Sequence, residues 1–151
     1  MAGIYLHIPF CKQACTYCNF HFSTLLKNKE DVLKAMLNEI QLQKDFFPDK
    51  TSIETIYFGG GTPSLLSSKE INELLNEINK HFTVSSTPEI TMEANPDDLS
   101  AAYLSTLKKE TAVNRFSIGV QSFFEEDLQY MNRAHNAQEA INCIKNAQEI
   151  G

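Results

Sequence analysis

The sequence lacks a long apolar run and has no cluster of basic residues. The apolar stretch at residues 4–10 is interrupted by His7 and Pro9, so it is too short for a membrane span or a signal peptide. The net charge is −6 and the pI is about 5.2, without the basic patch that nucleic-acid binding requires. We therefore expect a cytoplasmic protein that binds no nucleic acid, and a peripheral contact with a membrane stays open.

The sequence is also poor in cysteine, and its four cysteines do not resemble a secreted disulfide framework. Three of them, Cys11, Cys15 and Cys18, follow the spacing C-x3-C-x2-C. Thiolates gathered this closely favour an iron–sulfur cluster or a zinc ion. Three thiolates on a [4Fe–4S] cluster leave one iron open to a small molecule, whereas a zinc site would take His21 as its fourth ligand. Cys143 lies on an apolar helical stripe, which predicts a buried small side chain.

The chain shows no linker, low-complexity segment or domain boundary, and 151 residues with 42% hydrophobic content suit one domain. Short β-branched and aromatic runs predict strands at residues 3–8, 53–58, 88–93 and 115–120. Amphipathic stripes predict helices at residues 30–47, 100–110, 124–131 and 137–150, and another that begins at Ser67 or Ser68. This alternation predicts an α/β fold with a parallel sheet and right-handed crossovers.

Residues that can bind a ligand follow the predicted strands, at the carboxyl ends where the sites of parallel sheets are found. The run Gly59-Gly60-Gly61-Thr62 lets a ligand approach bare backbone. Glu93 can accept bonds from hydroxyl groups, Gln121 can donate and accept, and Arg133 can pair with a carboxylate. Each also has an ordinary alternative, as a turn glycine, a polar strand cap or a surface charge.

Four motifs carry a family resemblance: Tyr-Leu-His-Ile-Pro-Phe-Cys, Tyr-Phe-Gly-Gly-Gly-Thr-Pro-Ser, Glu-Ala-Asn-Pro and Arg-Phe-Ser-Ile-Gly-Val-Gln-Ser-Phe. In this order they resemble the radical S-adenosylmethionine (SAM) superfamily and, within it, the oxygen-independent coproporphyrinogen III oxidase family. The resemblance implies a six-stranded partial TIM barrel and a C-terminal domain. Because Gly151 comes before any fifth strand, we expect residues 1–151 to be the N-terminal portion of a radical SAM core, a partial barrel truncated after about four β/α units.

The resemblance also implies a role for each site residue. The three cysteines would hold a [4Fe–4S] cluster whose open iron binds SAM, and reductive cleavage of SAM would give a 5′-deoxyadenosyl radical. In this family the glycine run meets the amino group of SAM, Glu93 the ribose, Arg133 the carboxylate and Tyr17 the region of the adenine. The implied SAM contacts are Tyr5, Tyr17, Gly59, Gly60, Gly61, Thr62, Glu93, Gln121 and Arg133.

One position, Phe20, separates two branches of the family. Coproporphyrinogen oxidases proper carry a further cysteine there, whereas phenylalanine is typical of the haem-chaperone branch. The resemblance therefore favours a chaperone that binds haem and delivers it to acceptor haemoproteins. The alternative is an oxidase that decarboxylates two propionates of coproporphyrinogen III in porphyrin biosynthesis, so whether the chain is an enzyme stays open. Haem iron has candidate ligands in His21, His81 and His135, although surface or loop positions are the simpler interpretation of all three, and His7 is expected to be buried and hydrogen-bonded.

Overall fold

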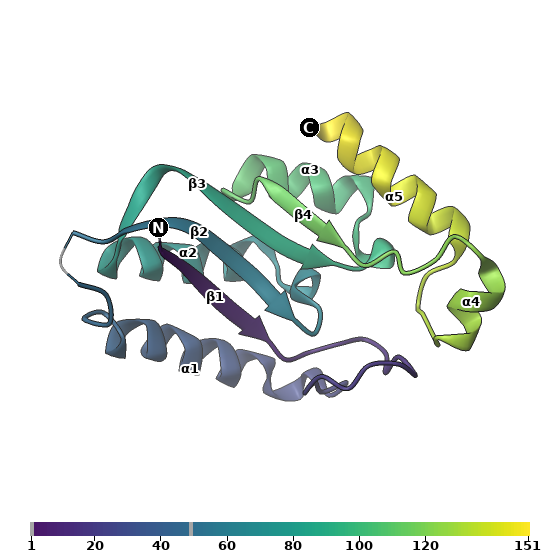
Figure 1. The fold of residues 1–151 in the computed structure, drawn as a ribbon, viewed down its shortest axis with the longest axis horizontal. Coiled ribbons are helices and arrows are strands. Elements are labelled where there is room, and N and C mark those ends of the chain that lie inside the picture. Colours follow the sequence, from purple (N-terminus) through teal and green to yellow (C-terminus); the bar gives the residue numbers. More distant parts are fainter. Residues whose placement is uncertain (1, 49) are drawn as a thin grey trace.

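A computed structural model describes residues 2–48 and 50–151. Its centre is one parallel sheet with the strand order β1-β2-β3-β4. The strands are β1 (Ala2–Ile8), β2 (Ser52–Gly60), β3 (Thr83–Ala94) and β4 (Arg115–Ile118). Each pair of consecutive strands is joined through a helix, namely α1 (Lys29–Leu42), α2 (Ser68–His81) and α3 (Ala101–Glu110), as Figure 1 shows. The predicted α/β fold with four β/α units is confirmed.

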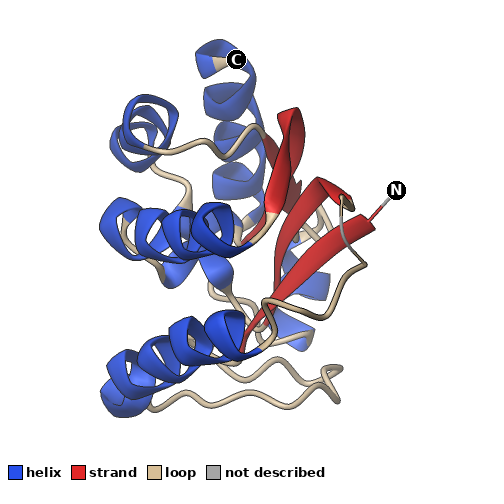
Figure 2. Ribbon diagram, turned by 90° about the vertical axis from the view of Figure 1, so that its left-hand side faces the viewer, coloured by secondary structure: helices blue, strands red, loops and turns tan. Residues whose placement is uncertain are grey.

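The sheet has one apolar face and one polar face. Leu6, Phe58, Met92 and Phe116 occupy matching register positions on neighbouring strands, and they belong to or pack against the main hydrophobic core. The helices cover this face (Figure 2). The residues one position earlier in each strand form a row of the opposite character, consisting of Tyr5, Tyr57, Thr91 and Arg115. Side chains alternate across a strand, so this polar row lies on the face away from the helices.

Helix α2 shows how the sequence fixes the position of one crossover. Ser67 is its N-cap, and a capping box joins the Ser67 side chain to the backbone of Glu70 and the Glu70 side chain to the backbone of Ser67. Its apolar stripe, which contains Ile71, Leu74 and Ile78, is fully buried. Such a cap stabilises a helix by about 1 kcal/mol, and the buried stripe fixes which side of the helix faces the sheet.

Four predicted elements differ from the structure by two residues or more at one end. Strand β3 begins at Thr83, five residues before the predicted start at residue 88. Helix α1 ends at Leu42 instead of residue 47, because Phe47 packs edge-on against Phe82, with ring centroids 5.8 Å apart, and does not continue the helix. Strand β2 continues into Gly59 and Gly60, which pair with the end of β1. Strand β4 ends at Ile118, two residues before the predicted end.

The remaining elements lie at the carboxyl end of the sheet or beside it. Helices α4 (Glu125–Tyr130) and α5 (Ala137–Ile150) follow β4, and 3-10 turns occur at Leu26–Asn28, Pro63–Leu65 and Pro96–Asp98. Within residues 2–48 and 50–151, no helix is both long enough and apolar enough to cross a bilayer.

Candidate cofactor site

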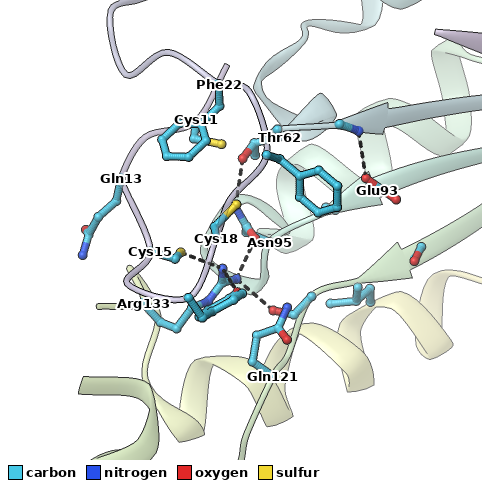
Figure 3. Close-up of a pocket in the computed structure, with 18 of the residues that line it drawn as sticks. Cys11, Gln13, Cys15, Cys18, Phe22, Thr62, Glu93, Asn95, Gln121 and Arg133 are labelled. Atoms are coloured by element: carbon cyan, nitrogen blue, oxygen red, sulfur yellow. Dashed lines mark hydrogen bonds between the residues drawn. The ribbon is translucent and has the colours of Figure 1, made fainter. Parts of the chain in front are cut away.

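A cavity of about 430 Å³ lies at the carboxyl ends of the four strands. All but two of the residues predicted for the site line it, and Figure 3 shows the labelled ones converging on the cavity from the cysteine loop, from strand ends and from the segments that follow β4. Those lining it are Cys11, Cys15, Tyr17, Cys18, Gly60, Gly61, Thr62, Glu93, Gln121 and Arg133. Tyr5 and Gly59 lie outside this lining, on the polar face of the sheet.

The cysteine loop, residues 11–22, has no helix or strand of its own and is closed at its base. The Cys11 backbone N–H donates to the Ser23 carbonyl at 3.0 Å, and the Ser23 N–H donates to the Pro9 carbonyl at 2.9 Å. Burial raises the pKa of the Cys11 thiol, and the neighbouring Cys18 and Cys15 raise that pKa further. The loop therefore brings three thiols to one wall of the cavity.

The three thiols line the same cavity but do not converge on a centre the size of one metal ion. Among the residues that the structure describes, no three His, Cys, Asp or Glu side chains are close enough to hold a single metal ion. A zinc ion needs four donors at about 2.0–2.3 Å from one centre, whereas a cluster takes a separate thiolate at each iron. His21, which the zinc alternative requires, does not line the cavity. The donor set therefore fits a multi-iron cluster better than zinc.

Arg133 ties the cysteine loop to two strand ends. One guanidinium nitrogen, Nη1, donates to Cys15 Sγ and to the Tyr17 hydroxyl, each at 3.2 Å. The other, Nη2, donates to Asn95 Oδ1 at 2.7 Å and to the Gly119 carbonyl at 2.9 Å. Asn95 in turn donates from Nδ2 to Thr62 Oγ1 at 3.2 Å. Asn95 is a site residue that the sequence analysis did not single out, although it directly follows β3 and Glu93.

The glycine run has a packing role in addition to the predicted exposure of backbone. A Cβ atom on Gly59 would lie 2.7 Å from the Tyr5 ring, and one on Gly60 would lie 2.7 Å from the His7 ring. A Cβ on Gly61 would lie 2.5 Å from the Phe10 carbonyl oxygen. The rings of Tyr5 and His7 thus lie against Gly59 and Gly60, and the contact of the three glycines with SAM stays a prediction.

Glu93 is held by two hydrogen bonds within the chain. Its Oε1 accepts from the Tyr57 hydroxyl at 2.7 Å, and its Oε2 accepts from the Gly60 backbone N–H at 3.0 Å. A carboxylate has about four acceptor positions, so Glu93 can still accept from a ligand. Tyr57 is a second residue that sequence reasoning missed, and the alternation along β2 that places it on the polar face was the available signal.

A model of the radical SAM superfamily matches residues 5–151. The chain belongs to the radical SAM superfamily. Curated relatives include proteins named "Heme chaperone HemW" from Bacillus subtilis, 37% identical over 100% of this chain and 40% of that protein, and from Escherichia coli, 39% identical over 99% of this chain and 39% of that protein. This radical SAM chain thus spans about two fifths of the length of the curated relatives it matches.

A solved structure, described as "Coproporphyrinogen III oxidase (HemN) from Escherichia coli is a Radical SAM enzyme", superposes with a TM-score of 0.87. It is 30% identical and covers 99% of this chain and 35% of that chain. Membership in the radical SAM superfamily implies SAM and a [4Fe–4S] cluster as cofactors. The three thiols and the polar groups of the cavity fit that pair, whereas the individual SAM contacts remain predictions.

The radical SAM fold leaves the histidines in four different settings. The ring of His7 lies on the polar face, with Nδ1 3.1 Å from the Tyr5 hydroxyl, so the expected burial is not found. His81 pairs with Glu77 at 2.8 Å, and His21 is exposed. His135 is 4% exposed and donates from Nε2 to the Val120 carbonyl at 3.0 Å. Burial lowers the pKa of His135, as does the nearby guanidinium of Arg133.

Proposed function

We propose that this chain forms the cluster-binding and SAM-binding part of a haem chaperone, which binds haem and delivers it to acceptor haemoproteins. The observation that carries the proposal is the convergence of Cys11, Cys15 and Cys18 on one cavity with Arg133 and Glu93. A [4Fe–4S] cluster held there by the three thiolates would, in its reduced form, supply one electron for the cleavage of SAM.

The residues of the chain act as holders in this proposal. The three thiolates bind one iron each, Arg133 pairs with the carboxylate of SAM, and Glu93 accepts hydrogen bonds from its ribose. Tyr57 and the Gly60 N–H orient the Glu93 carboxylate, since each bonds a different oxygen. Thr62, Gln121 and Tyr17 supply the remaining polar wall.

The haem-chaperone assignment is supported by the relatives named HemW and by Phe20. The Phe20 side chain is 75% exposed and lines the rim of the cavity, at the position where the oxidase branch carries a cysteine. The second candidate function is oxygen-independent coproporphyrinogen III oxidation. One observation favours it, the TM-score of 0.87 with the structure described as HemN.

The test is anaerobic reconstitution with iron and sulfide, followed by SAM calorimetry and parallel assays of haem binding and coproporphyrinogen III turnover. We expect cluster formation, SAM binding and haem binding without turnover. Replacing Cys11, Cys15 or Cys18 by alanine should abolish the cluster, whereas C143A, at a buried thiol that bonds the Ala140 carbonyl, is the matched control. Turnover of coproporphyrinogen III would establish the second candidate instead, and a full cluster in C15A would refute the ligand assignment.

A further inference from the structure

The cysteine loop is joined to the turn after α4 by an interlocking set of hydrogen bonds. Gln13 Nε2 donates to both the backbone carbonyl and Oδ1 of Asn132, each at 2.8 Å. In return, Asn132 Nδ2 donates to the Ala14 carbonyl at 2.8 Å. Thr16 adds its backbone N–H to the Met131 carbonyl and its hydroxyl to the Tyr130 carbonyl, at 3.2 and 3.0 Å. All these bonds reach loop residues that lie between Cys11 and Cys18.

Asn132 also directly follows Met131, the C-cap residue of α4. Its φ is +53°, in the left-handed region, where asparagine is tolerated better than most residues. Its N–H donates to the Gln129 carbonyl and the Arg133 N–H donates to the Leu128 carbonyl, at 3.0 and 2.9 Å, which is the bond pair of a Schellman motif. Glycine would satisfy this backbone equally well, so the cap alone does not explain the amide.

The side-chain amide of Asn132 therefore has a role other than capping the helix, and its position next to Arg133 indicates that role. The next residue along the chain is Arg133, whose guanidinium bonds Cys15 Sγ, Asn95 and the Gly119 carbonyl. Figure 3 shows Gln13 extending from the loop away from Thr62 and Glu93, while Arg133 reaches inward to the cavity. The outer bonds of Gln13 and Asn132 thus fix the loop to the same turn that presents Arg133 to the inner side.

We propose that Gln13 and Asn132 are positioning residues that clasp the cysteine loop to the Arg133 turn and thereby couple cluster binding to SAM binding. The proposal rests on the proposed function. We call the hydrogen bonds between Gln13, Ala14 and Asn132 the clasp; it joins the cysteine loop to the turn that carries Arg133. A ligand that orders the loop lowers the entropy cost of ordering the turn, and the reverse also holds. SAM bound by Arg133 should therefore slow the loss of iron, and the cluster should strengthen the binding of SAM.

An ion pair also holds the cysteine loop, and it differs from the neutral hydrogen bonds of Gln13 and Asn132. Lys12 Nζ pairs with Asp97 at 3.0 Å and also with Asp98, at the 3-10 turn after β3. This anchor is ionic and partly exposed, so salt weakens it. The clasp consists of neutral groups, so its contribution should persist at high salt concentration.

The experiment uses N132G, which keeps the left-handed cap and removes only the amide, together with Q13A and the double variant. The control is Q138A, because Gln138 Nε2 donates to Asn142 Oδ1 at 2.9 Å in α5 and forms an exposed Gln–Asn pair away from the cavity. Iron release from the anaerobically reconstituted protein to a chelator is followed with and without SAM, in 0.5 M salt. Amide hydrogen exchange of residues 11–22 is measured in the cluster-free protein.

We expect N132G and Q13A each to release iron about tenfold faster, because each variant removes two of the three side-chain hydrogen bonds between Gln13, Asn132 and Ala14 at a partly exposed site. The double variant should release iron faster than either single variant but more slowly than the product of their effects, because the bond from Gln13 Nε2 to Asn132 Oδ1 is lost in both. The slowing of release by SAM should shrink in both single variants, and Q138A should behave as the wild type. Amide hydrogen exchange of residues 11–22 should be faster in the cluster-free variants than in the cluster-free wild type. Strictly additive effects, or unchanged release and exchange in N132G and Q13A, would overturn the clasp. A wild-type protein that binds no cluster would refute the proposed function, while the exchange data would still decide the clasp.

Discussion

The guanidinium of Arg133 makes four hydrogen bonds, and R133K keeps its charge while removing this geometry. A lysine ammonium is a single point on a flexible stem, so it cannot span Cys15 Sγ, Asn95 Oδ1 and the Gly119 carbonyl together. A hydrogen bond from a charged donor contributes about 1.5–3 kcal/mol. If lysine regains the bond to one strand end and loses the other, the free energy of unfolding should fall by about 2–3 kcal/mol in this partly buried setting.

The assay for R133K is urea unfolding of the cluster-free protein, followed by far-UV circular dichroism because the chain has no tryptophan. The matched control is R115K, since Arg115 is 52% exposed and makes one hydrogen bond, to Thr91 Oγ1 at 3.1 Å. It should change the free energy of unfolding by less than about 0.5 kcal/mol. A loss in R133K no larger than that of the control would refute the view that Arg133 holds the loop and the strand ends together.

Three further predictions concern the site and its supports. E93A should weaken SAM binding about tenfold or more in calorimetry, while the iron content stays complete. The control is E89A, at an exposed glutamate of the same strand. An unchanged affinity for SAM in E93A would contradict the role of Glu93. G61A should lower iron content on reconstitution, because its Cβ would meet backbone atoms of Phe10 at 2.5 and 2.9 Å, and a full complement of iron would count against that contact. His135 has a pKa lowered by burial, so the unfolded chain takes up its proton first and stability should be lost as pH falls below about 6.5. H135Q should show a shallower loss of melting temperature between pH 7.5 and 5.5, and parallel curves would contradict this.

Local signals in the sequence were enough for most of the fold. The β-branched and aromatic run at residues 53–58 and the serine cap at Ser67 or Ser68 are short-range patterns, and the structure has a strand there and a helix capped by Ser67. The end of α1 was not predictable in this way. Phe47 leaves the helix to pack against Phe82, a residue 35 positions later, and a pattern of local periodicity contains no information on that contact.

The candidate site also contains residues that local patterns predict and residues that depend on long-range contacts. The positions of the cysteines, Glu93 and Gln121 at strand ends were enough to predict that they share one site. Parallel strands bring their carboxyl ends together whatever the details of packing. The residues it missed act through long-range pairing. Asn132 bonds Gln13 across 119 positions, and Tyr57 bonds Glu93 across 36. Nothing near Asn132 in the sequence distinguishes it from an ordinary turn asparagine, and alternation along β2 indicates the face on which Tyr57 lies but not its partner Glu93.

The polar row of the sheet constrains what can occupy the face opposite the helices. Tyr5, Tyr57, Thr91 and Arg115 stand side by side where a closed (β/α) barrel normally packs branched apolar side chains. Burying a hydroxyl or a guanidinium there without partners costs several kcal/mol. These groups have polar partners within the chain, since Tyr5 bonds His7, Tyr57 bonds Glu93 and Arg115 bonds Thr91. This face therefore suits contact with water or with a ligand that offers polar groups.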